Sequence, residues 1–182
     1  AWAATRTSPC ACSITRPAAI PAELKAAFFP EGLAEPGPPR PRFPGPPQPP
    51  AAAFRLERRV EWRDLDPAGH VNNGVYLAYV EDCGLQWLRS RGWPMARLVS
   101  EDLGIVARQH RIEYRLPALL DDELELATWA SDPGTTSVVR HTYILRHSDG
   151  QLVARARTHQ VWIDLQTGTP KPMPDALRAA MI

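Results

Sequence analysis

The apolar residues of this chain follow two different periods between residues 54 and 94. From Phe54 to Trp62 apolar and polar side chains alternate, which is typical of a β-strand with one buried face. From Val75 to Leu88 the apolar residues recur every three or four positions, and the sequence Gly-Trp-Pro ends this pattern at residues 92–94. The patterns predict a strand followed by a helix that is apolar around most of its circumference.

Four further strands are expected after this helix, at about residues 104–116, 123–131, 136–147 and 152–165. The breaks between them are polar or contain glycine, as is typical of turns that join antiparallel strands. One strand, one long helix and then four consecutive strands predict an α+β domain. In this domain an antiparallel five-stranded sheet wraps around a long central helix.

Prolines divide the chain into parts. The chain has 20 prolines, and half of them lie between Pro30 and Pro50. Proline favours extended polyproline geometry, so residues 30–53 are predicted to form a semi-rigid linker. The folded domain is therefore expected at residues 54–182.

Residues 1–29 are weakly similar to the end of the same chain, residues 154–182. The matching positions include Pro17, Pro21 and Leu24 with Pro170, Pro174 and Leu177. We interpret residues 1–29 as the tail of a truncated first repeat. The alternative is a targeting segment, because the first acidic residue is Glu23 and the opening is rich in Ala, Ser, Thr and Arg, as in organellar transit peptides.

Charge and cysteine content narrow the classes of protein. A net charge of +1 gives no indication of a nucleic-acid partner, and no apolar run approaches the roughly 18 to 20 residues that a membrane span requires. The three cysteines, Cys10, Cys12 and Cys83, suit neither a disulfide framework nor a metal site. We expect a reducing compartment, the cytoplasm, or an organelle if residues 1–29 are a transit peptide.

The junction between the expected first strand and the helix carries the candidate chemistry. Residues 62–73 read WRDLDPAGHVNN. An aspartate after a strand, a glycine turn and a helix start together place a carboxylate beside N–H groups that lack a helical partner. Such a carboxylate, here Asp66, can deprotonate a water or attack a carbonyl. The alternative is that Asp66 only closes an Asx turn before Pro67.

The same residues carry a resemblance to a known family, which covers residues 54–165. Asp64-x-Asp66-Pro-Ala-Gly69 resembles the active-site loop of the 4-hydroxybenzoyl-CoA thioesterase type. A second, overlapping set of residues resembles a motif of the acyl-ACP thioesterases and their bacterial acyl-CoA relatives. These residues are Asp64, Leu65, Asp66, His70, Val71, Asn72, Asn73 and Tyr76. The domain is therefore identified as a member of the hotdog-fold thioesterases, among which tandem repeats are known.

The resemblance also implies roles for individual residues. Asp66 would be the catalytic carboxylate, as base or nucleophile. The backbone N–H of Asn73, with that of Gly74, would bind the oxyanion. His70 would have a supporting role, since Ala68 stands where acyl-ACP thioesterases have an active-site asparagine.

Other residues are expected to contact the substrate. Asn72, Gly74 and Tyr76 lie at the helix start, and Arg108 is one of several basic residues on its strand that could bind the phosphates of coenzyme A. Glu81, on the helix, would either orient the water or face solvent or another subunit. The candidates for an acyl pocket, or otherwise for the core, are Trp87, Trp129 and Trp162.

The activity implied by the resemblance is that of an acyl thioesterase in fatty acid metabolism, which hydrolyses an acyl-CoA or acyl-ACP to a free acid and a thiol. No metal or bound cofactor is expected. Coenzyme A would enter the reaction as part of the substrate. Hotdog units pair, so a homodimer or a tandem pseudo-dimer is expected, without nucleic acid or membrane. Two alternatives stay open: a hydroxyacyl dehydratase of the same fold, and a non-catalytic acyl-binding or scaffold module.

Overall fold

The computed structural model describes residues 19–32, 37–39, 41–46 and 48–181. The chain divides into two compact units, Ala1–Arg42 and Phe43–Ile182. The first unit contains one short helix, α1 (Ala22–Phe28), of which no residue is buried. Of the positions in which residues 1–29 resemble the chain's end, Pro21 and Leu24 are among the described residues, whereas Pro17 lies outside them.

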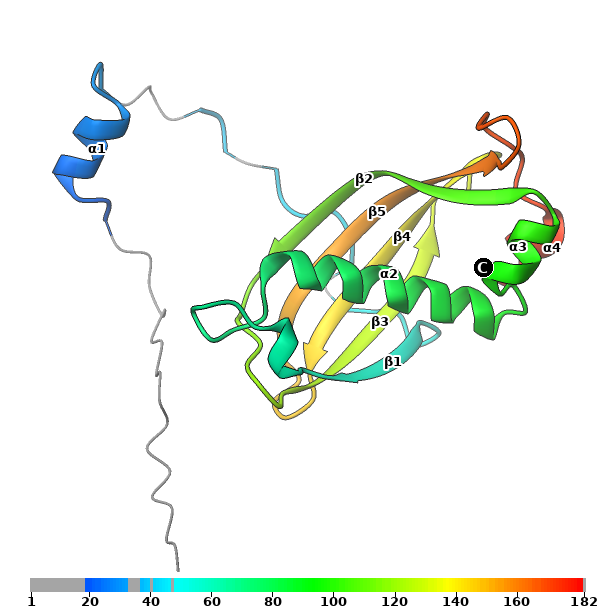
Figure 1. Cartoon of the computed structure of the whole chain (residues 1–182), viewed down its shortest axis with the longest axis horizontal. Helices are drawn as coiled ribbons and strands as arrows, with labels where there is room; N and C mark the ends of the chain where they lie inside the picture. The colour runs from blue at the N-terminus through cyan, green and yellow to red at the C-terminus, as the bar shows by residue number, and fades with distance from the viewer. Residues whose placement is uncertain (1–18, 33–36, 40, 47, 182) are drawn as a thin grey trace, which may run out of the picture. The chain divides into compact units, whose positions relative to one another are not determined.

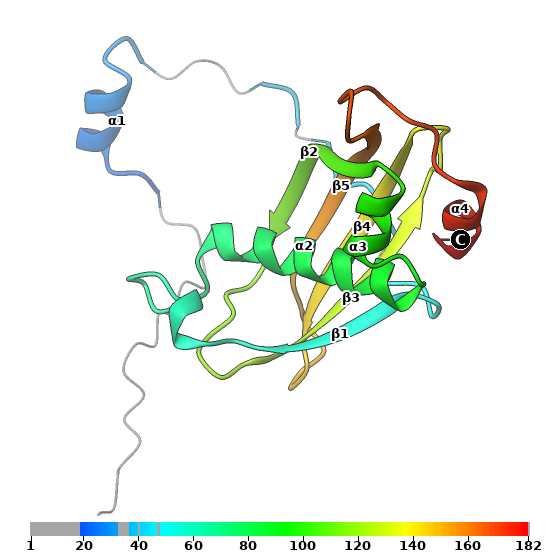
Figure 2. The same cartoon turned by 45° about the vertical axis from the view of Figure 1, so that its right-hand side comes forward.

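The second unit is built on a five-stranded antiparallel sheet and one long helix (Figure 1). The strands are β1 (Phe54–Arg59), β2 (Leu103–Tyr114), β3 (Glu123–Ser131), β4 (Ser137–Arg146) and β5 (Leu152–Asp164). Their order in the sheet is β1-β3-β4-β5-β2, so β1 and β2 form the edges. The helix α2 (Asn73–Ser90) crosses one face of this sheet in both views (Figure 2). The predicted hotdog fold of the α+β class is confirmed.

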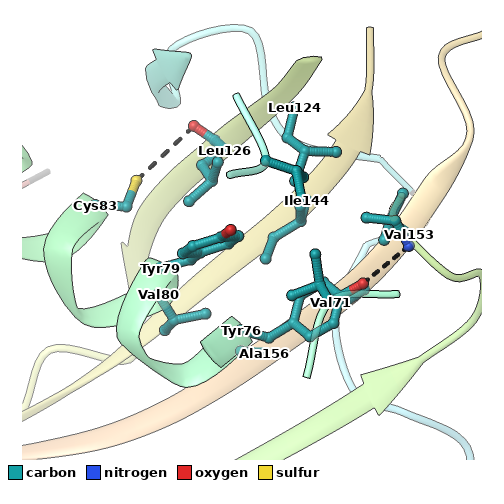
Figure 3. Packing of buried hydrophobic residues seen from close by; sticks show 13 residues of the cluster. Val71, Tyr76, Tyr79, Val80, Cys83, Leu124, Leu126, Ile144, Val153 and Ala156 are labelled. Carbon is teal, nitrogen blue, oxygen red and sulfur yellow. Dashed lines mark hydrogen bonds between the residues drawn. The ribbon is translucent and has the colours of Figure 1, made fainter. Parts of the chain in front are cut away.

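The apolar spacing of α2 explains why it packs on the sheet. Its buried residues recur every three or four positions along the helix, and they are Tyr76, Tyr79, Val80, Cys83, Gly84, Trp87 and Leu88. Tyr79, Val80 and Cys83 point towards Leu126 and Ile144 of the sheet (Figure 3). Small residues on β5, among them Ala154 and Ala156, are also buried in this core, so the helix can approach closely.

Two short helices pack near the C-terminal end of α2, and neither is predicted from the sequence. They are α3 (Met95–Ser100) and α4 (Asp175–Met181). Their buried residues Leu98, Leu177 and Met181 share a second core cluster with Trp87 and Trp162. Such short helices leave too little sequence for a helical period to show.

The first strand is shorter than expected. β1 ends at Arg59, and Val60 donates its N–H to the carbonyl of Asp122. The 3₁₀ helix η1 (Trp62–Asp64) follows, and Trp62 is 80% exposed rather than part of the buried strand face. The prediction that the strand reaches Trp62 is wrong, because a capping box between Glu61 and Asp64 turns the chain there.

The end of the proline-rich stretch packs on the sheet. The central guanidinium carbon of Arg155 lies 4.5 Å from the centre of the Phe43 ring. The carbonyl of Pro46 accepts a hydrogen bond from the hydroxyl of Tyr143 at 2.5 Å. Residues 43–46 therefore belong to the compact unit, although the proline pattern places them in the linker.

Candidate active site

The loop before α2 is fixed by a buried carboxylate. Asp64 is 5% exposed, and its Oδ2 accepts hydrogen bonds from the N–H of Glu61 at 2.9 Å and from the hydroxyl of Tyr79 at 2.6 Å. Its carbonyl accepts the N–H of Asn72 at 2.9 Å. Asp64 thus ties the loop to α2 through both its side chain and its backbone.

Asp66 lies at the tip of this loop, in a tight turn. Its N–H donates to the carbonyl of His70 and its carbonyl accepts the N–H of Gly69, both at 2.9 Å. Gly69 has φ of +80°, a conformation that glycine adopts without strain. The turn therefore brings the side chains of Asp66 and His70 to the same side of the loop.

The carboxylate of Asp66 is engaged at both oxygens. Oδ1 accepts the N–H of Ala68 at 2.9 Å, which is the Asx turn expected as the alternative interpretation. Oδ2 lies 3.4 Å from Nδ1 of His70, and the two side chains are 21% and 24% exposed. The Asx turn and a chemical role are compatible, because Oδ2 and its neighbour His70 stay accessible to solvent.

The start of α2 leaves one backbone N–H group free. Asn72 is the N-cap, and its side-chain oxygen accepts the N–H of Gly74 at 2.8 Å, while its carbonyl accepts the N–H of Val75 at 2.9 Å. Among the described residues, none accepts a hydrogen bond from the N–H of Asn73. This amide, at the positive end of the helix dipole, is therefore available to a ligand oxygen.

The loop of residues 117–122 supports the loop that carries Asp66. Val71 donates its N–H to the carbonyl of Ala118 at 2.9 Å, and His70 forms an isolated β-bridge with Leu119. The N–H of Ala118 in turn donates to the hydroxyl of Tyr76 at 3.1 Å. The turn that carries Asp66 is thus clamped between α2 and residues 117–122.

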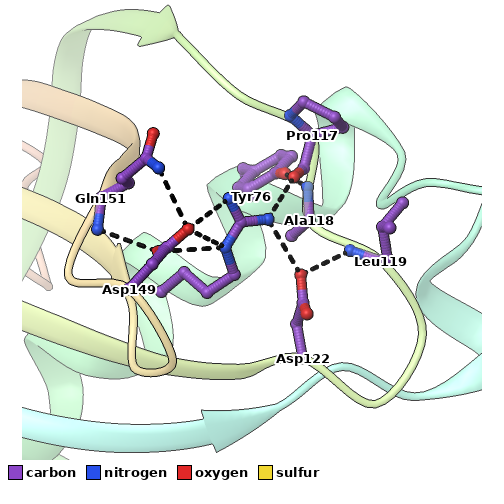
Figure 4. A network of polar contacts seen from close by, with 8 residues as sticks. Tyr76, Pro117, Ala118, Leu119, Asp122, Asp149 and Gln151 are labelled. Carbon is purple, nitrogen blue, oxygen red and sulfur yellow. Dashed lines mark hydrogen bonds and ion pairs between the residues drawn. The ribbon is translucent and has the colours of Figure 1, made fainter. Parts of the chain in front are cut away.

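Arg146 holds the supporting loop in place. Its guanidinium forms ion pairs with Asp149 at 3.0 Å and with Asp122 at 3.6 Å, and donates to the carbonyl of Pro117 at 3.4 Å (Figure 4). Asp122 also accepts the N–H of Leu119 at 2.9 Å. The pKa of Arg146 is raised, first by its hydrogen bond to Asp149. These contacts link the β4–β5 turn to the loop beneath His70.

Three expected substrate contacts are placed differently. Tyr76 is 3% exposed, and its hydroxyl accepts the N–H of Ala118, so its side chain lies in the core and supports the loop of residues 117–122. The N–H of Gly74 donates to the side chain of Asn72, so of the two expected oxyanion donors Asn73 is the one whose N–H has no acceptor among the described residues. Arg108 is exposed at a β-bulge of the edge strand β2, and no hydrogen bond or ion pair joins it to the Asp66 loop within the described chain.

The three tryptophans proposed for an acyl pocket separate in the structure. Trp87 lines a cavity beside α2, whereas Trp162 is fully buried in the core. Trp129 stacks on His141, with ring centres 5.1 Å apart. Cys83 is buried, and burial raises the pKa of its thiol to about 12, which makes it a poor nucleophile.

Two supporting residues are missed by sequence reasoning. Tyr79 reads only as a core position of the helix, and its hydroxyl bond to Asp64 depends on the folded loop. Tyr114 donates its hydroxyl to the carbonyl of Asn73 at 2.9 Å from the end of β2, which is distant in sequence. The helical period of α2 signals that Tyr79 is buried, but not that it has a polar partner.

The comparisons with known proteins show the family to which this chain belongs. The family described as the Thioesterase-like superfamily matches residues 60–181, which include the Asp66 loop, α2 and the other four strands. The chain belongs to the Thioesterase-like superfamily. The prediction of a hotdog-fold thioester hydrolase is thereby confirmed.

Relatives in the superfamily cover most of the second unit. The chain is 30% identical over 126 residues to the acyl-CoA thioester hydrolase YbgC of Escherichia coli O157:H7, spanning 69% of this chain and 93% of that one. It is 30% identical over 117 residues to the long-chain acyl-CoA thioesterase FadM of Escherichia coli K12, spanning 63% and 86%. The crystal structure of the 1,4-dihydroxy-2-naphthoyl-CoA thioesterase of Synechocystis aligns with a TM-score of 0.67 at 26% identity, over 71% and 96%.

The described residues form neither a metal site nor a membrane-spanning helix. No group of three or more His, Cys, Asp or Glu side chains in the described chain is arranged to hold a metal ion. Within the same residues, no helix has the length and apolar character needed to cross a membrane.

Proposed function

We propose that this member of the Thioesterase-like superfamily hydrolyses acyl-CoA thioesters, with Asp66 as the general base. The observation that supports the proposal is that one loop carries both a solvent-accessible carboxylate, that of Asp66, and, seven positions later, the free N–H of Asn73 at the start of α2. A base and an oxyanion donor are the two groups that acyl transfer to water requires. The relatives' names, which specify acyl-CoA, support coenzyme A over a carrier protein.

The proposed reaction balances with these groups and one water. Asp66 accepts a proton as the water oxygen attacks the thioester carbonyl, and the carbonyl oxygen becomes an oxyanion that accepts the N–H of Asn73. The C–S bond then breaks, the acid forms, and the proton passes to the thiolate of coenzyme A. Coenzyme A enters as part of the substrate.

Base catalysis fits the contacts of Asp66 better than covalent catalysis. Both carboxylate oxygens are engaged, Oδ1 with Ala68 and Oδ2 beside His70. Taking a proton from water leaves the bond to Ala68 in place. Acylation of either oxygen would displace a contact that holds the carboxylate, so we assign the attack to water. His70 would orient the carboxylate from its other side.

Release of free thiol from a panel of acyl-CoAs tests the proposal. The variant Asp66→Asn keeps an oxygen for the Ala68 hydrogen bond but loses the base, so we expect turnover to fall about 100-fold or more. The matched control is Asp132→Asn in the exposed β3–β4 turn, which removes one carboxylate and should leave turnover unchanged. Unchanged turnover in Asp66→Asn would show that another group activates the water.

A single turnover in ¹⁸O-labelled water separates the two roles of Asp66. Base catalysis places one labelled oxygen in the acid product of the first turnover. An unlabelled first product, with the label in the carboxylate of Asp66, would overturn base catalysis, because it arises only when water attacks the carboxyl carbon of an acylated Asp66.

A further inference from the structure

A cavity of about 180 Å³ lies beside the C-terminal half of α2. Its apolar walls come from α2, α3, β2 and the end of α4, and include Trp87, Leu88, Met95, Ile105, Ala107 and Met181. Three polar residues interrupt this apolar surface: Glu81, Arg140 and Gln160. A cavity of roughly 150 Å³ is large enough for a benzene ring, so this one can hold a group of that size.

Arg140 is the unusual residue of the cavity wall. Its side chain is 2% exposed, with Nη2 2.7 Å from a carboxylate oxygen of Glu81 and Nη1 donating to the carbonyl of Val80 at 2.9 Å. Its Nε is buried and has no hydrogen-bond partner among the described residues. Glu81 therefore balances the charge of Arg140, but N–H donors of the guanidinium remain unused.

The helix is shaped to receive this guanidinium. A Cβ on Gly84 would lie 1.3 Å from Nη1 of Arg140, so only glycine leaves space for it. Glycine in a helix interior is less favourable than alanine, and burying a guanidinium is costly even when a carboxylate, here that of the 42% exposed Glu81, balances its charge. Gly84 within the helix and the buried charge of Arg140 are both unfavourable for stability, and together they place a guanidinium at the cavity wall.

A stripe of residues on one side of α2 runs from the helix start to the cavity wall, where it includes Glu81 and Leu85. Gly74, Leu77, Ala78, Glu81 and Leu85 follow the helical period on the side opposite the buried residues. From Asn73 to Gly84 the helix rises by roughly 16 Å at 1.5 Å per residue. An extended chain advances about 1.2 Å per bond, so an acyl chain of about 14 carbons spans this distance.

We propose that the cavity binds the distal end of a long acyl chain, and that Arg140 favours chains with a hydroxyl or keto oxygen at that end. This inference rests on the proposed function, which places the acyl carbonyl at Asn73. A neutral oxygen suits the site because it accepts an unused N–H of Arg140 without competing with Glu81. A distal carboxylate would meet the carboxylate of Glu81 and is disfavoured.

Small probes test the cavity without any turnover. We expect phenol to bind the purified chain at least five-fold more tightly than toluene, which has nearly the same shape but no acceptor. The variant Ala107→Phe, which fills the cavity from β2, should abolish binding of both. Val106→Phe is the matched control, because neighbouring side chains of a strand face opposite sides and Val106 does not line the cavity. Equal affinities of phenol and toluene, or binding that survives in Ala107→Phe, would overturn the proposal.

Kinetics with matched substrates test the acyl assignment. The 14-carbon acyl-CoA with a terminal hydroxyl should have a kcat/KM at least five-fold above that of the plain 14-carbon chain. Arg140→Met should remove this preference and leave a four-carbon acyl-CoA unaffected. If that variant does not fold, Ala107→Phe should lower kcat/KM for both long chains while the four-carbon substrate is again unaffected.

The outcomes separate the two proposals. If no thioester is cleaved but phenol binds selectively, the thioesterase proposal fails and so does the acyl assignment, while the cavity's preference for an acceptor oxygen stands. If thioesters are cleaved without preference for the terminal hydroxyl, the thioesterase proposal stands and the role of Arg140 in selection is overturned.

Discussion

The hydroxyl of Tyr79 donates a 2.6 Å hydrogen bond to Oδ2 of Asp64, which joins the middle of α2 to the loop that carries Asp66. Burial, and then this bond to a carboxylate, raise the pKa of Tyr79, so the hydroxyl keeps its proton at any physiological pH. The guanidinium of Arg58 lies over the Tyr79 ring at 4.2 Å from the ring centre. The position of the proposed base is thus set from the helix.

We expect Tyr79→Phe to lower the free energy of unfolding by about 1.5 to 3 kcal/mol, as is usual for a hydrogen bond to a charged group. The loss arises because Asp64 keeps its buried charge but has one donor fewer. Urea unfolding of Tyr79→Phe, Asp64→Asn and the double variant measures the coupling between the two side chains. Additive effects would show that the two side chains act independently.

The cap of α2 gives a second prediction. Asn72→Ala removes the acceptor for the N–H of Gly74, and loss of an N-cap typically lowers stability by about 0.5 to 2 kcal/mol. Turnover should also fall, because the freed amide of Gly74 no longer fixes the direction of the neighbouring Asn73 N–H. Asn72→Asp is the control, since its carboxylate still accepts and should keep both properties near those of the parent chain. Equal losses in the two variants would contradict the capping explanation.

The sequence contained the local features of the site but not its long-range contacts. The helix start and the Asx turn at Asp66 depend on neighbouring residues, and the pattern of residues 62–73 predicts them. The bond from Tyr79 to Asp64 and the pairing of Arg140 with Glu81 depend on how the sheet meets the helix.

Strand parity does not place Arg140. It shares its parity on β4 with Val138, Thr142 and Ile144, but the residues of the other parity, Val139, His141 and Tyr143, are buried as well. Because both faces of this strand are covered, alternation does not show which side chains point towards the helix. The partner on α2 could not be named from this, because the register between helix and sheet is set only by packing.

His141 makes stability depend on pH. It is 5% exposed, and burial, with the nearby charge of Arg157, lowers its pKa below the ordinary 6.5. A lowered folded-state pKa means that the unfolded chain binds more protons just below pH 6.5, so stability falls as the pH drops from 6.5 towards the folded-state value. His141→Gln should flatten this part of the pH dependence, as measured by urea unfolding at a series of pH values. An unchanged slope between pH 5 and 7 would assign the effect to other groups.

The contact between Gly84 and Arg140 predicts that a helix-favouring substitution destabilises this protein. Alanine is about 1 kcal/mol better than glycine in a helix interior, yet a Cβ at position 84 would lie 1.3 Å from the guanidinium of Arg140. Overpacking of this kind usually costs about 1 to 3 kcal/mol, so we expect Gly84→Ala to unfold at lower denaturant than the parent chain. In an Arg140→Ala background the clash is absent, and the same substitution should become neutral or stabilising. Urea unfolding of the four chains measures this reversal, and a Gly84→Ala effect of the same sign and size in both backgrounds would show that the guanidinium does not need the space.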